Sequence, residues 1–190
     1  DNNCIDSYTW KSVPIIDKNC PRNPVMEQVI AQFSCQVDEK YNHIVARFRR
    51  ELTHPERNQE TELGDLLADI FTQSLGVDVM LLGSGSIRAE RLGPVVTYRN
   101  LTEAFPYDDG VYLFKVTGRQ LRHMLREESF AGHTEFYQIP AALRLRYSRS
   151  NHDFESLTYK GEKVTDERIF TVGMQNFHFQ NITSFFDVTR

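Results

Sequence analysis

The stretch that decides the fold is Val77-Asp-Val-Met-Leu-Leu-Gly-Ser-Gly-Ser-Ile-Arg88. Its first six residues form a short apolar run of the length and branching that predict a buried β-strand. The run stops in four small residues, and Gly83 and Gly85 can adopt backbone angles closed to other residues, which lets backbone amides approach a ligand. Arg88 follows with a permanently charged fork that suits carboxylate or phosphate. Together they predict the edge of an anion-binding site; a plain tight turn beside a surface arginine is the alternative interpretation.

The amino-acid composition, the net charge and the absence of certain motifs exclude several classes of protein. An apolar fraction of 40% and a charged fraction of 25% are typical of a globular domain. A net charge of −4 argues against a general nucleic-acid binder. The glycine turn is not a P-loop, because no Gly-Lys-Ser/Thr follows it. No apolar run in the sequence approaches the length of a membrane span, and the N-terminus lacks the regions of a signal peptide.

The cysteines are too few and too widely spaced for a disulfide framework or a zinc site. Cys4, Cys20 and Cys35 are odd in number, so we expect reduced thiols, with a Cys4–Cys20 bridge as the alternative. These cysteines favour a cytoplasmic protein over an exported one, but the sequence leaves the location open.

Helix-capping residues, glycine stops and apolar periodicity predict the order of the helices and strands. Residues 1–22 are expected to form an extended lead-in, and residues 23–190 a single domain. Asn23 and Pro24 begin a helix whose apolar residues recur at helical spacing, so one face is expected to pack inward. Further helices are expected from Glu62 to a stop near Gly76, from Asn100 or Thr102, and after Thr117. Strands are expected at residues 43–52, 77–82, 95–98, 111–116, 143–148 and 168–174, and a hairpin around Gly161 is expected at residues 157–164. This alternation predicts an α+β fold of mixed sheets layered with helices, with two intertwined halves as one arrangement.

The one motif that suggests catalysis is Asn151-His152-Asp153, which is similar to part of the metal site of calcineurin-like phosphoesterases. A dinuclear metal site needs several more carboxylates and histidines than this sequence offers at suitable spacing. A turn between two strands is therefore the favoured interpretation. The remaining histidines, His43, His54, His123, His133 and His178, show no ligand spacing. We expect no catalytic residue and no metal site in this chain.

Binding residues are better represented. Arg57, Arg88, Tyr107 and Phe177 stand in loops or at the ends of elements, where ligand contacts concentrate. Arginines bind phosphate or carboxylate, and two aromatic rings can hold a planar base between them. We predict that these four side chains converge on one slot.

The order of several segments resembles a known family, the C-terminal domains of the 5′-nucleotidases, UDP-sugar hydrolases and 2′,3′-cyclic phosphodiesterases. The matching segments are Glu60-Thr-Glu-Leu-Gly-Asp-Leu-Leu-Ala-Asp, Gly83-Ser-Gly-Ser-Ile-Arg88, Phe105-Pro-Tyr-Asp-Asp, Val116-Thr-Gly-x-x-Leu121, Tyr159-Lys-Gly-Glu-Lys-Val and Val172-Gly-Met-Gln-Asn-Phe177. Six matches in order are far more specific than any one of them.

The resemblance implies the substrate-binding half of a two-domain hydrolase of nucleotide catabolism. In this family a separate N-terminal metallophosphoesterase domain, absent from this chain, holds two divalent metals (Zn or Mn), so this fragment alone is expected to be inactive. The implied ligand is a nucleotide or nucleoside, and neither a nucleic-acid polymer nor a membrane span is expected. The substrate-binding residues implied are Arg57, Arg88, Tyr107, Phe177, Asp109, Gly83, Gly85 and Asn176.

The sequence departs from the family in three places, one of which is Tyr107, where the family usually has a phenylalanine; tyrosine keeps the stacking face and adds a hydroxyl. Gly83 stands where many members have an asparagine that contacts the nucleoside, and Thr183 falls near the place of a ribose-binding aspartate. These departures keep an alternative open, namely a non-catalytic binding or interaction module that kept the fold and lost nucleotide binding.

Overall fold

The computed structural model describes residue 5 and residues 7–130, 136–148 and 153–183. Contacts divide the chain into two units, residues 1–42 and residues 43–190. The expected division into a lead-in of residues 1–22 and a domain of residues 23–190 stays a prediction.

Helix α1 (Pro24–Tyr41) is the main element of the first unit. Asn23 caps it as predicted, because its Oδ1 accepts hydrogen bonds from the N–H groups of Val25 and Met26. Within the first unit the predicted inward packing is not found, since the helix has no buried residue there and Phe33 is 64% exposed. Helical periodicity identifies an apolar stripe but says nothing about what covers it.

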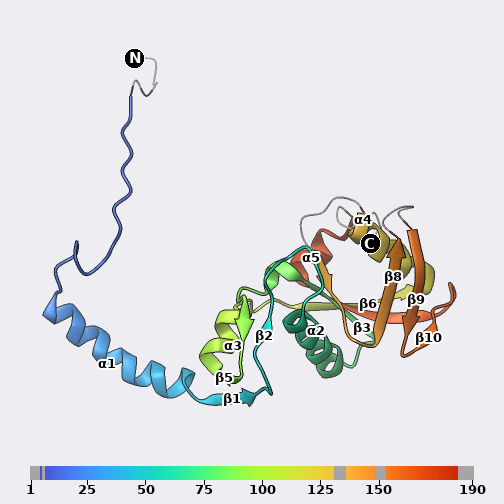
Figure 1. Ribbon diagram of the computed structural model, residues 1–190, viewed down its shortest axis with the longest axis horizontal. Helices are drawn as coiled ribbons and strands as arrows, with labels where there is room; N and C mark the ends of the chain where they lie inside the picture. The colour runs from blue at the N-terminus through green and yellow to red at the C-terminus, as the bar shows by residue number, and fades with distance from the viewer. Residues whose placement is uncertain (1–4, 6, 131–135, 149–152, 184–190) are drawn as a thin grey trace. The chain divides into compact units, whose positions relative to one another are not determined.

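A mixed four-stranded sheet organises the second unit (Figure 1). Its strand order is β6 (Val111–Thr117), β11 (Ile169–Gln175), β3 (Val79–Gly83) and β7 (Tyr137–Gln138). Strand β3 runs parallel to β11, and the other two pairs are antiparallel. The smaller sheets pair β1 (Ile44–Arg47) with β5 (Val95–Thr97), β2 (Leu52–Thr53) with β4 (Arg91–Leu92), and β8 (Leu143–Ser148) with β9 (Asp153–Tyr159) and β10 (Glu162–Lys163). The helices are α2 (Glu62–Leu75), α3 (Tyr98–Ala104), α4 (Gly118–Phe130) and α5 (Asn176–Gln180). The predicted α+β fold is confirmed.

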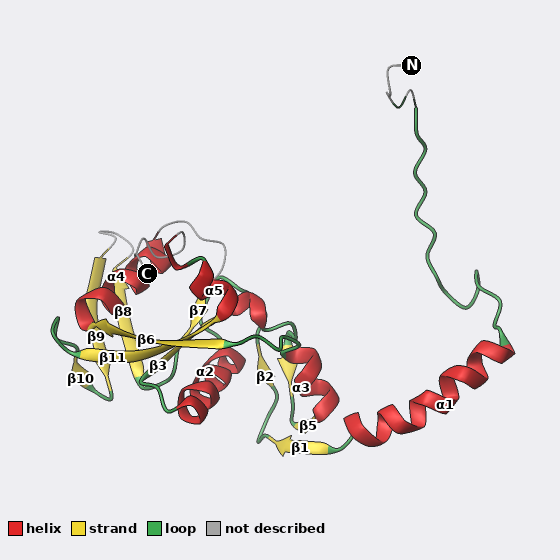
Figure 2. Ribbon diagram, turned by 180° about the vertical axis from the view of Figure 1, so that it is seen from behind, coloured by secondary structure: helices red, strands yellow, loops and turns green. Residues whose placement is uncertain are grey.

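Strand β3 is buried on both faces and separates two cores. Val79 and Leu81 belong to the core formed with α4 and the β8–β9 pair, whereas Met80 and Leu82 belong to the core formed with α2. This alternation follows from the two-residue period of a strand. Figure 2 shows α2 on one side of the sheet, with α4, β8 and β9 on the other. A continuous apolar run was therefore the right signal for a strand covered on both faces.

Local sequence signals located α2 well and α3 less well. Thr61 caps α2 by accepting from the N–H of Gly64, and Gly76 ends it in the left-handed conformation (φ 64°). Helix α3 begins earlier than expected, because Thr97 is its cap. The side chain of Asn100, at the third helical position, accepts a hydrogen bond from the backbone N–H of Thr97. The strand expected at residues 43–52 breaks into β1 and β2, separated by a bend.

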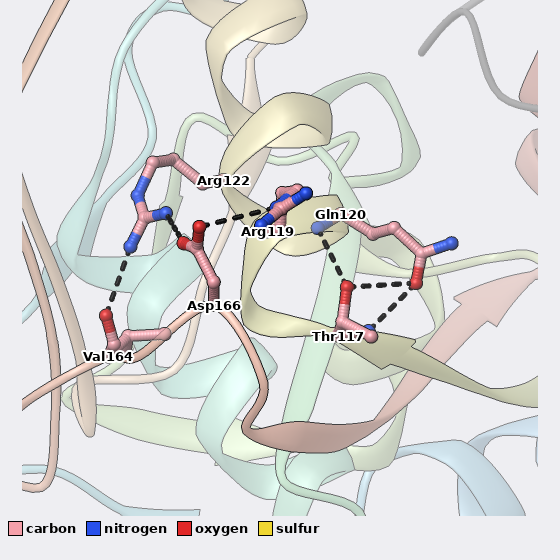
Figure 3. Close-up of polar contacts among 6 residues, drawn as sticks. All are labelled: Thr117, Arg119, Gln120, Arg122, Val164 and Asp166. Atoms are coloured by element: carbon pink, nitrogen blue, oxygen red, sulfur yellow. Dashed lines mark hydrogen bonds and ion pairs between the residues drawn. The ribbon is translucent and has the colours of Figure 1, made fainter.

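The start of α4 is held against the loop that follows β10 (Figure 3). Thr117 and Gln120 exchange hydrogen bonds that cap the helix, as the Thr-Gly-x-x-Leu segment led us to expect. Two arginines of this helix, Arg119 and Arg122, contact the carboxylate of Asp166. Their contact holds the pKa of Asp166 below its usual value, with the hydrogen bond from Arg122 as the larger cause.

We predict that Gly118→Ala destabilises the domain. A Cβ atom at this position would overlap the backbone oxygen of Thr165 and lie 2.8 Å from Cγ1 of Val164. Backbone cannot rotate away as a side chain can, so the substitution should cost about 1–3 kcal/mol. Thermal unfolding should show a melting temperature lower by about 3 °C or more. Gly110→Ala, where an added Cβ meets nothing within 4 Å, is the matched control, and equal melting temperatures for the two variants would refute this account.

Asp65, in the first turn of α2, lies in an acidic and partly buried environment. Burial and the neighbouring carboxyl groups of Glu60 and Asp69 raise the pKa of Asp65 from 3.8 to about 7, and Arg144 opposes this shift. Between about pH 4 and 7 the folded state therefore holds a proton that the unfolded state releases. Its stabilising contribution is complete below pH 4 and is lost as the pH rises to 7.

We predict that Asp65→Asn removes this part of the pH dependence. Asparagine keeps the shape of the protonated acid but cannot ionise, so the variant should gain melting temperature relative to wild type as the pH rises from 4 to 8. A relative gain of about 2 °C or more is expected for each kcal/mol involved, measured by calorimetry. The exposed carboxylate variant Glu103→Gln serves as the control. Parallel pH profiles for Asp65→Asn and wild type would contradict the prediction.

Candidate functional site

One pocket, with a volume of about 290 Å³, lies at the edge of the four-stranded sheet. Its wall is formed by the 3₁₀ turn η1 (Ser84–Ser86), by the loop before β6, and by the end of β11 with the start of α5. The residues that line it are Gly85, Ser86, Arg88, Tyr107, Asp109, Gln175, Phe177 and His178. Because β3 and β11 are parallel neighbours, their carboxyl ends meet at one edge of the sheet, which is where ligand sites of such sheets form.

The pocket brings together five of the eight residues that the sequence analysis selected. These are Gly85, Arg88, Tyr107, Asp109 and Phe177. The loop that carries Tyr107 and Asp109 reaches this edge because β6 begins opposite the end of β11, with Val111 paired to Gln175. The pairing of three strands therefore assembles residues that are far apart in the sequence.

Two aromatic rings form part of the wall and remain accessible. The Tyr107 side chain is 45% exposed and the Phe177 side chain 59% exposed. Tyr107 is supported by an edge contact with Phe105, at 6.4 Å between ring centroids, and Phe177 by an edge contact with His178 at 5.3 Å. Supported but accessible rings can stack on a planar ligand.

Arg88 supplies the positive charge of the pocket. Its backbone N–H donates to the carbonyl of Ala104 at 2.8 Å, and its Nη1 donates to the carbonyl of Gly85 at 3.2 Å. These contacts tie the arginine to the turn while leaving the side chain exposed. Asp109 supplies an exposed carboxylate on the same wall, so the pocket offers both a cation and an acceptor.

Three polar residues of the wall are buried and were missed by the sequence analysis. Ser86, Gln175 and His178 are 7%, 4% and 7% exposed. The Ser86 hydroxyl donates to Oε1 of Gln175 at 2.8 Å. Gln175 was detectable in principle, since it is the polar residue that ends the apolar run of β11 directly before the pocket helix.

Gly83 does not line the pocket, and the expected role of the two glycines is corrected. Gly83 has an ordinary extended backbone (φ −61°), and Gly85 does not adopt a positive φ either. A Cβ atom at residue 83 would instead overlap the imidazole ring of His178. Glycine is needed here for space, because the ring of His178 occupies the volume next to the strand.

Arg57 and Asn176 also lie off the pocket wall. Arg57 is exposed, and its carbonyl oxygen accepts from the N–H of Phe136 at 2.7 Å. The side chain of Asn176 accepts from Gln180 at 3.3 Å, within α5. The expected convergence of four side chains is therefore met by three, and Thr183 is exposed and absent from the wall as well.

A buried hydrogen-bond network supports the turn from behind. His54 contacts the hydroxyl of Thr61 at 2.7 Å through Nδ1 and the carbonyl of Ser84 at 3.1 Å through Nε2. Burial lowers the pKa of His54, so we assign a neutral ring whose Nε2–H donates to Ser84 and whose Nδ1 accepts from Thr61. Gln138 donates to the hydroxyl of Ser84 and accepts from the backbone N–H of Thr61. The network thus joins the start of α2 to η1.

Within the described part of the chain, no group of three or more histidine, cysteine or acidic residues is arranged to hold a metal ion. The segment Asn151–Asp153 falls largely outside the described residues. Among the helices that the structure describes, none is long and apolar enough to cross a membrane.

Comparisons with known proteins agree with this architecture. Among solved structures, the chain is similar to a 5′-nucleotidase precursor from Thermus thermophilus, with 20% identity, a TM-score of 0.65, and coverage of 86% of this chain and 35% of that chain. It is also similar to the Thermus thermophilus sulfate thiohydrolase SoxB, with 14% identity, a TM-score of 0.64, and coverage of 90% and 34%. The third is the Haemophilus influenzae NAD nucleotidase NadN, with 15% identity, a TM-score of 0.58, and coverage of 84% and 33%.

At these identities the similarity shows the fold alone, and this chain spans about a third of the length of those proteins. Comparison with curated proteins found no match. The family model described as "5′-nucleotidase, C-terminal domain" matches residues 37–189, which is most of the chain. The protein therefore belongs to the family of 5′-nucleotidase C-terminal domains.

Proposed function

We propose that this domain recognises a nucleoside or nucleotide for a 5′-nucleotidase-like phosphoric ester hydrolase. The observation that carries the proposal is the convergence of Arg88, Tyr107 and Phe177 on one pocket. Its volume of about 290 Å³ lies at the lower end of the range for small-ligand sites. Names of similar proteins, which include a 5′-nucleotidase and an NAD nucleotidase, support a nucleotide ligand.

The chemistry of the wall suits the parts of a nucleotide. Tyr107 and Phe177 offer accessible π-faces for a base, and stacking of this kind tolerates different bases. Arg88 offers a charged donor for phosphate, and the carboxylate of Asp109 can accept from ribose hydroxyls. We assign the anion contact to Arg88 rather than Arg57, because only Arg88 lines the pocket.

Hydrolysis is proposed to take place in a separate N-terminal metallophosphoesterase domain. Two divalent metal ions held there, Zn or Mn, would polarise the phosphate and activate water. The described residues of this chain form no cluster suited to such metals. Its part in the reaction is to bind and orient the substrate, and the chain alone is expected to release no phosphate.

A non-catalytic module that kept the fold and lost nucleotide binding is the competing function. A sulfate thiohydrolase among the similar structures shows that proteins named for a different substrate also contain this fold. Binding of nucleosides and their 5′-monophosphates to this chain, measured by titration calorimetry, separates the two functions. Binding of none of these ligands would favour the module.

We predict that Tyr107→Ala weakens nucleoside binding about tenfold, because stacking on an aromatic ring contributes about 1–3 kcal/mol per base. Tyr107→Phe keeps the stacking face and is the matched control, expected within about twofold of wild type in dissociation constant. Calorimetric titration with adenosine and uridine gives the measurement. An unchanged affinity in Tyr107→Ala would remove this ring from the site.

We predict that Arg88→Ala weakens binding of a nucleoside 5′-monophosphate by about tenfold or more, since a hydrogen bond to a charged group contributes about 1.5–3 kcal/mol. The parent nucleoside should lose much less, because it lacks the phosphate. Arg57→Ala, an exposed arginine off the pocket wall, should bind both ligands as wild type does. Equal losses for nucleotide and nucleoside would mean that Arg88 contacts another part of the ligand.

A further inference from the structure

Gln175 is a buried amide on the wall of the pocket. Its side chain is only 4% exposed, yet the residue lines the cavity. Its backbone is fixed by pairing with Val111 at the last position of β11. The residue is therefore held rigidly at the carboxyl edge of the sheet.

Ser86 determines how the amide is oriented. The Ser86 hydroxyl donates to Oε1 of Gln175 at 2.8 Å, and Ser86 itself is buried in the turn η1. The carbonyl oxygen of the Gln175 amide thus accepts from Ser86, and the NH₂ group of the amide remains as a hydrogen-bond donor. The NH₂ group makes no hydrogen bond to any residue of the described ranges. This NH₂ group is not one of the fully buried unpaired atoms of the described residues, so it is open to the pocket, where it can donate to water or to a ligand that supplies the acceptor.

Burial separates the wall into two chemical zones. Arg88 and Asp109, which carry the charges, are exposed, whereas Gln175 is buried and neutral. A phosphate or a sugar hydroxyl matches the exposed zone. The neutral heterocycle of a ligand stacked on the exposed ring of Phe177 can direct one edge toward Gln175, since Phe177 stands two residues beyond Gln175 on the same wall.

We propose that Gln175, oriented by Ser86, is a specificity-determining residue that donates a hydrogen bond to an acceptor atom of the bound base. The acceptor is a ring nitrogen or a carbonyl oxygen of the heterocycle. This inference rests on the proposed function, because it names the group that reads the base in the same pocket.

The test combines protein variants with ligands that lack one acceptor. Dissociation constants are measured for wild type, Gln175→Ala and Gln175→Glu with adenosine, guanosine and uridine. The ligands with one weakened acceptor are the 1-, 3- and 7-deaza purine nucleosides, in which C–H replaces a ring nitrogen, and the 2- and 4-thio pyrimidine nucleosides. Gln180→Ala, an exposed glutamine off the wall, is the matched control.

We expect Gln175→Ala to weaken binding of the preferred nucleoside about three- to tenfold, the range of one neutral hydrogen bond. Gln175→Glu should bind more weakly still, because a carboxylate presents lone pairs to an acceptor. One acceptor-weakened analogue should lose affinity for wild type and lose none for Gln175→Ala, which identifies the contacted atom. Ser86→Ala should give part of the loss, since the amide is then free to turn. A merely structural role for Gln175 would lower the affinity for all analogues equally.

The outcomes separate the two proposals. If wild type binds a nucleoside but no analogue couples to Gln175, this inference is overturned and the proposed function stands. Coupling to a donor group of the base instead would mean that the amide presents its oxygen, and would overturn the inference as well. If wild type binds no nucleoside, the proposed function fails and the inference fails with it.

Discussion

The parallel pairing of β3 with β11 is the constraint on which the rest of the second unit depends. It aligns Val79 with Val172 and Leu81 with Met174, so both strands contribute to one core, and β3 buries Met80 and Leu82 on its other face. Each face then requires cover, which α2 supplies on one side and α4 with the β8–β9 pair on the other. Because β3 and β11 are parallel, the segments that follow them, η1 and α5, begin at the same edge of the sheet. The core and the pocket therefore have the same origin.

Sequence patterns predicted the elements whose limits depend on local chemistry. Helix α2 begins after Thr61 and ends at Gly76, and α4 begins after Thr117. These limits were predictable because helix caps and left-handed terminating residues act within a few residues. Strand limits were less predictable, since a strand ends where its partner ends. The run expected at residues 43–52 stops at Arg47, where its partner β5 begins with Val95.

Long-range contacts explain what the sequence could not show. The ring of His178 fills the space beside Gly83, and Ser86 orients Gln175 across 89 positions of sequence. Neither contact follows from spacing or periodicity, which report only local geometry. Arg57 is the converse case, because a position in a polar loop suggested binding while the fold keeps it off the pocket wall. The pattern of α1 likewise identified an apolar stripe without identifying a partner.

The presence of glycine at residue 83, where many family members have asparagine, bears on how the pocket recognises its ligand. The resemblance to the family suggested that glycine at this position loses a polar contact to the nucleoside. In the structure the absence of a side chain on β3 makes room for His178, and the neighbouring end of β11 contributes the amide of Gln175. Polar groups are thus present on the buried wall, but they come from β11 and α5. A departure at one strand end therefore does not imply a loss of binding, because an adjacent strand end faces the same pocket.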